Sequence, residues 1–347
     1  FRSRRVKQAK EKGMVSMKDV AAACGVSVAT VSKALSNHRD IGENTKQQIR
    51  AMAEEMGYHP NQSARYLKTN RSYNIGVLFE DAAGSGLTHD FFSGVLQGFK
   101  KAAEAKGYDV AFLNNTSSDM SYVERARYRG FDGVAIVCCL DYTNSKIVEL
   151  LQSSLKVVSI DYIADNRTAI LSNNADGIAR LMQYIFELGH TRIAYVHGDS
   201  NRVTRQRLAS YYTCMEERGL PVPDGYVLPG LYRNLDKAYE QTERLLDMKE
   251  PPTCILYSDD IACFGGINAI KARGLSIPDD ISVAGYDGVK AAQYEAPKLT
   301  TFYQNVGEMG RQAAVRLIEE IEHPMTTIPA IHTVDGYLIE GQTVRKI

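Results

Sequence analysis

Five side chains near the N-terminus have the chemistry needed to contact double-stranded DNA. Val28 and Ala29 can touch thymine methyl groups, and Lys33 can reach the acceptor edge of a guanine. Thr30 and Ser32 can donate hydrogen bonds to phosphates, which position a protein on DNA without reading its sequence. All five contacts require one exposed helix face, so neighbouring elements must hold these residues together.

The surrounding pattern predicts three short helices. A helix is expected over residues 17–24 with Ser16 as its cap, and a second helix from Ser27 to about residue 35. Gly25-Val26 separates the two, and a third helix is expected at about residues 43–56. Two short helices joined in this way are typical of a helix-turn-helix, although any three-helix bundle also fits the spacing. In a helix-turn-helix the second helix enters the major groove.

Charge is divided unevenly along the chain. The formal net charge is +0, but residues 1–72 carry 14 Lys and Arg against 6 Asp and Glu, whereas the remainder carries 27 against 35. Without residues 1–13 the N-terminal region still has 8 basic and 5 acidic residues. A basic head on an acidic body indicates a polyanionic partner for the head alone.

From Asn74 onward, short apolar runs alternate with amphipathic stretches. The runs predict strands at residues 75–79, 110–113, 134–137, 157–160, 193–196, 254–257 and 281–284, and the stretches predict helices at residues 92–106, 178–188, 205–218 and 263–273. This alternation is typical of parallel sheets covered by helices, and the length suffices for two such lobes. Functional loops are then expected at the carboxyl ends of the strands, as at Asp259.

Composition excludes several functional classes. No uninterrupted apolar stretch reaches the roughly 18 residues of a membrane span, and the N-terminus lacks the apolar region of a secretory signal. The 6 cysteines are scattered without paired metal spacing, which predicts reduced core residues in a cytoplasmic protein that needs no metal or cofactor. An enzyme is not expected, because no G-x-G-x-x-G follows the first strand and no phosphate-binding loop lysine is present.

The run Met17–Leu35 resembles the head of the LacI/GalR (lactose-repressor) family of bacterial transcriptional regulators, and Gly57–Asn61 and Ala64–Leu67 continue the likeness through that family's hinge. The resemblance implies a DNA-binding head at residues 14–59, followed by a hinge helix and linker at residues 60–73. It implies that Val28, Ala29 and Lys33 read bases. The residues expected to position phosphates are Ser16, Thr30, Ser32 and Thr45.

The hinge carries its own hypothesis. By resemblance, Asn61–Lys68 folds only on operator DNA, where two copies lie in the minor groove. Leu67 would insert into the central base step, and Arg65 or Lys68 would contact the backbone. The alternative is a solvated linker in which Leu67 only covers the junction between domains.

The likeness extends over the body through Asp90–Gly98, Leu188–Tyr195, Asp279–Asp287 and Leu299–Thr301. It implies a small all-α helix-turn-helix head plus an α/β periplasmic-binding-protein-like body of two parallel-sheet lobes. Lobe 1 is expected at about residues 74–170 and 302–332, and lobe 2 at about residues 171–301 and 333–347, with three chain crossings between them. An effector would bind in the cleft between the lobes.

Cleft residues follow from the same resemblance. Arg207 matches the family's effector-binding arginine and Asp287 its acidic or amide partner; the remaining candidates are Phe91, Phe92, Asp161, Tyr232 and Asp259. A guanidinium and carboxylates that pair with hydroxyls, beside aromatic faces, suit a sugar. Asn173-Asn174 stands where Asp-Asn is common, which removes one carboxylate. A nucleobase, a nucleoside or a phosphorylated metabolite therefore stays open as the ligand.

These features predict a transcriptional regulator, most simply a repressor, controlled by a small molecule. One head reads about half a turn of DNA, so a homodimer on a pseudo-palindromic operator is expected, with no membrane partner. A solute-binding protein has similar lobes, but it would need an export signal and would have no helix-turn-helix head.

Overall fold

The computed structural model describes residues 15–35, 38–58, 71–80, 86–113, 119–294 and 296–347. The chain forms two compact units that divide between Ser72 and Tyr73. The smaller unit is helical, and the larger unit contains three sheets with helices packed on them.

The three helices predicted for the head are present, as α2 (Met17–Cys24), α3 (Val28–Leu35) and α4 (Glu43–Met56). Ser16 begins α2 with a capping box, in which the Asp19 carboxylate accepts from the Ser16 backbone N–H at 2.9 Å. Gly25 ends α2 in the left-handed region, at φ 68°. The apolar faces of the three helices form one small core of Val20, Ala21, Val31, Ala34, Ile49, Ala53, Met56 and Tyr58.

The first lobe of the body is a six-stranded parallel sheet in the order β11-β5-β4-β3-β1-β2. Its strands are β1 (Asn74–Phe79), β2 (Asp109–Phe112), β3 (Gly133–Cys138), β4 (Lys156–Ile160), β5 (Thr168–Ser172) and β11 (Ile331–Val334). The 3-10 turn η1 (Gly86–Thr88) precedes its first helix. The helices of this lobe are α6 (Asp90–Ala105), α7 (Tyr122–Tyr128), α8 (Ser145–Gln152) and α13 (Val306–Glu322).

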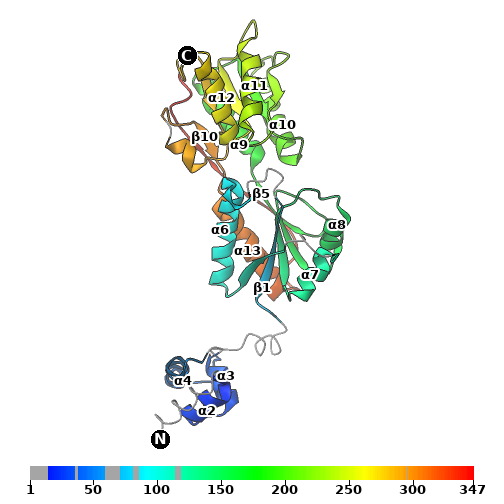
Figure 1. Ribbon diagram of the computed structural model, residues 1–347, viewed down its shortest axis with the longest axis vertical. Helices are drawn as coiled ribbons and strands as arrows, with labels where there is room; N and C mark the ends of the chain where they lie inside the picture. The colour runs from blue at the N-terminus through cyan, green and yellow to red at the C-terminus, as the bar shows by residue number, and fades with distance from the viewer. Residues whose placement is uncertain (1–14, 36–37, 59–70, 81–85, 114–118, 295) are drawn as a thin grey trace. The chain divides into compact units, whose positions relative to one another are not determined.

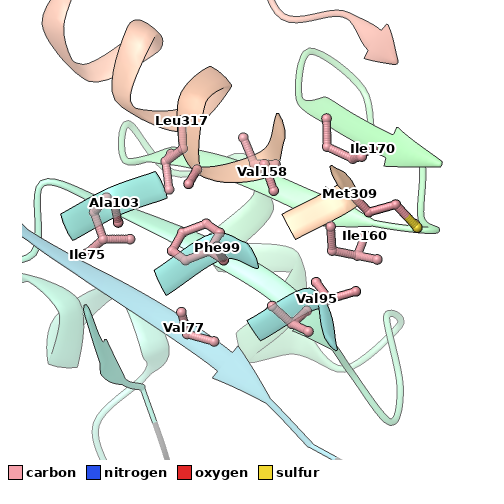
Figure 2. Close-up of a cluster of buried hydrophobic side chains, with 14 of the residues drawn as sticks. Ile75, Val77, Val95, Phe99, Ala103, Val158, Ile160, Ile170, Met309 and Leu317 are labelled. Carbon is pink, nitrogen blue, oxygen red and sulfur yellow. The ribbon is translucent and has the colours of Figure 1, made fainter. Parts of the chain in front are cut away.

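Helices cover both faces of this sheet, as a parallel sheet requires. Helices α6 and α13 lie side by side on one face, and α7 and α8 cover the other (Figure 1). Phe99 of α6 lies among Ile75, Val77 and Leu317, so the buried layer joins residues that are far apart in the sequence (Figure 2).

The second lobe is a four-stranded parallel sheet in the order β7-β6-β8-β9. Its strands are β6 (Ile193–His197), β7 (Val227–Pro229), β8 (Cys254–Tyr257) and β9 (Ser282–Ala284). Helices α9 (Asn174–Glu187) and α10 (Arg202–Glu217) pack on one face, and α11 (Leu235–Leu246) and α12 (Asp260–Ala272) pack on the other. The 3-10 helix η2 (Lys290–Gln293) follows β9.

The chain crosses between the lobes three times: after β5, after β10 (Thr301–Tyr303) and before β12 (Tyr337–Ile339). Strands β10 and β12 pair antiparallel with each other. The first sheet continues two residues beyond the lobe boundaries expected at residues 170 and 332, because β5 and β11 stay paired as far as Ser172 and Val334.

Among the described residues, no helix has the length and apolar character needed to cross a membrane. Within those residues no group of three or more His, Cys, Asp or Glu side chains is arranged to hold a metal ion.

Candidate functional site

The exposed face of α3 carries the side chains predicted to read bases. Val28 is 40% exposed, and Ala29 and Lys33 are exposed as well. Val31 and Ala34 point the other way and are fully buried in the head core. The helix therefore presents a surface of small apolar groups and one cation, as a major-groove reader needs.

Two of the four residues predicted to position phosphates, Ser16 and Thr30, have hydrogen-bond partners within the head. The Ser16 hydroxyl donates to the Asp19 carboxylate at 2.6 Å, and the Thr30 hydroxyl shares a 2.9 Å hydrogen bond with the Ser27 hydroxyl. Ser32 and Thr45 are half-buried.

Lys33 forms an ion pair with Asp40, and its hydrogen bond lowers the pKa of that carboxyl. Binding to a base or phosphate would exchange this contact. The four hinge residues Asn61, Arg65, Leu67 and Lys68 lie outside the described residues.

Arg207, on α10, is the centre of a polar cluster in the second lobe. Its side chain is 3% exposed, its Nε donates to Asn174 Oδ1 at 2.8 Å, and its Nη1 donates to the Ser258 carbonyl at 2.9 Å. The guanidinium carbon lies 3.7 Å from the ring centroid of Tyr286 and 5.9 Å from that of Tyr232. Burial alone would lower the pKa of Arg207, but the neighbouring tyrosines and Asp287 hold it above its ordinary value.

Asp287 follows β9 as predicted, with its backbone in the left-handed region at φ 101°. Its Oδ1 accepts a 2.6 Å hydrogen bond from Gln304 Nε2. Burial raises the pKa of this carboxyl most, Arg207 lowers it and Asp259 raises it, and together these and weaker contributions bring the pKa to about 7. The hydrogen bonds and ion pairs of the described residues include no direct contact between Arg207 and Asp287, so Arg207 acts on Asp287 only through its field.

Asp259, which lies just after β8, stabilises the local structure through hydrogen bonds. Its Oδ1 caps α12 by accepting from the Ala262 N–H at 2.8 Å. Its Oδ2 accepts from the Arg233 N–H and from the Ser258 hydroxyl, each at 2.9 Å. Three donors therefore already satisfy this carboxylate, which the sequence placed among the effector residues.

Tyr232 lies in the loop between β7 and α11. Its hydroxyl shares a 2.8 Å hydrogen bond with the Thr204 hydroxyl, and burial raises its pKa. The ring lies against Gly198, where an added Cβ would come within 2.3 Å of it. The flanking residues Leu231 and Arg233 both have positive φ, at 63° and 55°.

The first lobe contributes aromatic and acidic residues. Phe91 and Phe92 pack edge to face with centroids 5.2 Å apart, and Phe92 also contacts Phe79 at 5.4 Å. The Asp161 Oδ1 accepts from the Ser172 N–H at 2.8 Å. Burial raises the pKa of Asp161 to about 6, and Arg207 of the other lobe opposes that rise.

A cavity of about 870 Å³ lies beside this cluster. Of the predicted effector residues, only Phe91 and Asp287 line it; its charged lining residues include Asp90, Lys101, Lys290 and Arg311. Of the predicted residues, Tyr232 thus lies beside Arg207 in the buried cluster, Phe91 lines the cavity, and Asp287 belongs to both. Phe92 instead packs against Phe91 and Phe79.

Sequence reasoning missed the two amides that hold the charged pair in place. Asn174 was considered only as the neighbour of a lost carboxylate, but it fixes the Arg207 guanidinium. Gln304 holds Asp287 and also bonds to the Ser172 hydroxyl of the first crossing. No local pattern marks either residue, because Asn174 and Arg207 are 33 residues apart in the sequence, and Gln304 and Asp287 are 17 apart.

Comparison with known proteins accounts for both units. Residues 16–61 match the family described as bacterial regulatory proteins, lacI family. Residues 182–344 match the periplasmic binding protein-like domain.

Two curated relatives span nearly the whole chain. The probable HTH-type transcriptional repressor ExuR of Bacillus subtilis (strain 168) is 32% identical over 337 residues, which cover 96% of this chain and 99% of the relative. The HTH-type transcriptional repressor PurR of Haemophilus influenzae (strain PittEE) is 30% identical over 344 residues, covering 96% and 100%.

Solved structures share the fold. The lac repressor dimer bound to operator and the anti-inducer ONPF has a TM-score of 0.74 at 24% identity, covering 96% of this chain and 99% of that one. The transcriptional regulator CelR in complex with cellobiose has a TM-score of 0.68 at 21% identity, covering 94% and 99%.

Proposed function

The chain belongs to the lacI family of bacterial regulatory proteins, and from that membership we propose that it is a transcriptional repressor whose operator binding is controlled by a small molecule. One observation carries the proposal. The likeness to a named repressor runs through 96% of the chain, so it includes the DNA-reading head and the ligand-sensing body together. An enzyme and a solute-binding protein would each lack the head.

The head would read an operator with α3 in the major groove. In this proposal Val28, Ala29 and Lys33 meet base edges. The residues that bind phosphates are Ser16, Thr30, Ser32 and Thr45, and the hinge residues that bind in the minor groove are Asn61, Arg65, Leu67 and Lys68. Exposure of Val28, Ala29 and Lys33 on one face supports this division. Two heads in a homodimer would recognise a pseudo-palindrome.

The body would bind its effector between the lobes, and the proposed effector class is a sugar. Arg207 and Asp287 would contact it directly, because Arg207 is held rigidly by Asn174 while Asp287 keeps lone pairs beyond its one bond to Gln304. Tyr232, Phe91 and Phe92 would offer aromatic faces to C–H groups, and Asp161 a second carboxyl. Asp259 would contribute mainly by shaping the site, since its oxygens are already satisfied.

Selection of DNA duplexes tests the first half of the proposal. The full chain, mixed with a random duplex library, should enrich a pseudo-palindromic sequence. The Lys33→Gln variant should lose preference at one base pair of each half-site. Thr45→Ala should instead weaken binding to all duplexes about equally, as a lost phosphate contact does. Failure of the full chain to enrich any sequence would overturn the proposal.

Thermal unfolding of the full chain tests the second half. A sugar such as cellobiose or D-ribose should raise the melting temperature in a panel that also contains D-glucose 6-phosphate and adenine. The rise should vanish in Arg207→Ala and Asp287→Asn but persist in Arg205→Ala, a matched control at an exposed position of the same helix. If only adenine or the sugar phosphate raised the melting temperature, that compound class would replace sugars as the proposed effector. A rise that persists in both site variants would place the ligand elsewhere.

A further inference from the structure

One ion pair connects the two lobes of the body. Arg233, between β7 and α11 of the second lobe, places Nη1 3.1 Å from Oδ2 of Asp90, the first residue of α6 in the first lobe. The other ion pairs among the described residues stay within a lobe or within the head. This contact is therefore suited to sense how the lobes are arranged.

Arg233 is fixed more firmly than a typical surface arginine. Its side chain is only 16% exposed, and its backbone N–H donates to Asp259 Oδ2 at 2.9 Å. Its φ of 55° is an unfavourable conformation for a residue with a Cβ, so the surrounding contacts must hold it there. An arginine already ordered in this way gives up less side-chain entropy when it pairs across the lobes.

The residue next to Arg233 belongs to the proposed effector site. Tyr232 faces Arg207 and is held by Thr204 and Gly198, while Leu231 and Arg233 on either side have positive φ. Tyr232 and Arg233 are consecutive residues, so a displacement of the Tyr232 backbone would also move Arg233. The field of Arg233 also reaches Asp287, whose pKa it lowers.

We propose that Arg233 is a positioning residue whose ion pair with Asp90 couples the effector site at Tyr232 to the arrangement of the two lobes. A small molecule that moves Tyr232 would strengthen or break this pair, and the first lobe would follow through α6. This inference rests on the proposed function, because the arrangement of the lobes matters only if it controls DNA binding.

A double-mutant cycle on DNA binding tests the coupling. The full chain, Asp90→Asn, Arg233→Gln and the double variant are titrated with the duplex that the unaltered chain selects, without added small molecule. Each single variant should change the dissociation constant in the same direction by about 2- to 5-fold. The double variant should match the singles, because removing either partner already breaks the pair. Asp176→Asn with Arg180→Gln is the matched control, an ion pair of 2.7 Å confined to α9, and should leave binding unchanged.

The outcomes separate this inference from the proposed function. If the unaltered chain selects no duplex, the proposed function fails and the coupling fails with it. If it selects a duplex but the single variants bind like the unaltered chain, or their effects multiply in the double variant, only the coupling is overturned. Loss of binding that accompanies a melting temperature lowered equally in all three variants would also overturn it, since the pair would then act on stability alone.

Discussion

Asp287 should make the stability of the body depend on pH, and replacing it with asparagine should remove that dependence. Burial raises the pKa of this carboxyl from an ordinary 3.8 to about 7 in the folded chain. At pH values between these two pKa values, Asp287 keeps its proton in the folded protein but has lost it in the unfolded chain. The free energy of unfolding must therefore fall as the pH rises from about 4 to about 7.

The magnitude follows from the same pKa. Each pH unit within this window is worth at most about 1.4 kcal/mol, and the curve flattens near pH 7, so Asp287 should remove about 2 kcal/mol of stability between pH 5 and pH 7. Asparagine has nearly the same shape, carries no charge and can still accept the hydrogen bond from Gln304 Nε2. Asp287→Asn should therefore gain stability relative to the unaltered chain as the pH rises.

Urea unfolding at pH 5, 6 and 7, followed by circular dichroism, measures this difference. Asp165→Asn, which removes an exposed carboxylate of the first lobe, is measured in parallel as the control. A constant difference between Asp287→Asn and the unaltered chain would refute the reasoning, because Asp287 would then titrate alike in the folded and unfolded states.

Three further substitutions test other parts of the argument. Arg207→Ala should lower the free energy of unfolding by about 3 kcal/mol in urea titrations, since it leaves buried partners at Asn174 and Ser258 without their donor; a loss no larger than that of an exposed arginine would contradict this. Ser16→Ala should cost the head about 1 kcal/mol in thermal unfolding, because the cap of α2 is lost, whereas an unchanged melting curve would exclude the cap as a stabilising contact. Leu67→Ala should weaken binding to the selected duplex more than to random DNA in a titration, and equal losses would reject insertion of this side chain between base pairs.

Elements marked by strong local signals were predictable from the sequence. Ser16 and Gly25 mark the ends of α2 through capping chemistry that acts within a few residues, and the apolar runs of β6 and β8 are buried on both faces. Helix α13 was not predicted, because Gly307 and Gly310 weaken the helical signal. The structure explains why a glycine is needed at position 310, because a Cβ there would come within 1.9 Å of the Val95 carbonyl oxygen of α6.

The acidic residues of the candidate site show where sequence reasoning stops. Three acidic residues each follow a strand: Asp161, Asp259 and Asp287. Their positions in the sequence therefore predict the same role, effector binding, for all three. Their donors distinguish them: among the described residues, the Asp259 carboxylate accepts three hydrogen bonds, whereas those of Asp161 and Asp287 each accept one.

A carboxylate satisfied by helix capping has little to offer a ligand, while one held by a single bond and kept close to neutrality by burial can accept or donate to a hydroxyl. Burial raises the pKa of Asp161 to about 6 and that of Asp287 to about 7, and the one hydrogen bond that each side chain accepts leaves lone pairs for a further donor. Arg207 carries the charge opposite to that of both carboxylates but bonds directly to neither. Its Nε donates instead to Asn174, and its Nη1 donates to the Ser258 carbonyl. A polar ligand that bridges Arg207 to either carboxyl would supply hydrogen bonds to both of the groups it joins, which supports the effector contacts proposed for Arg207 and Asp287.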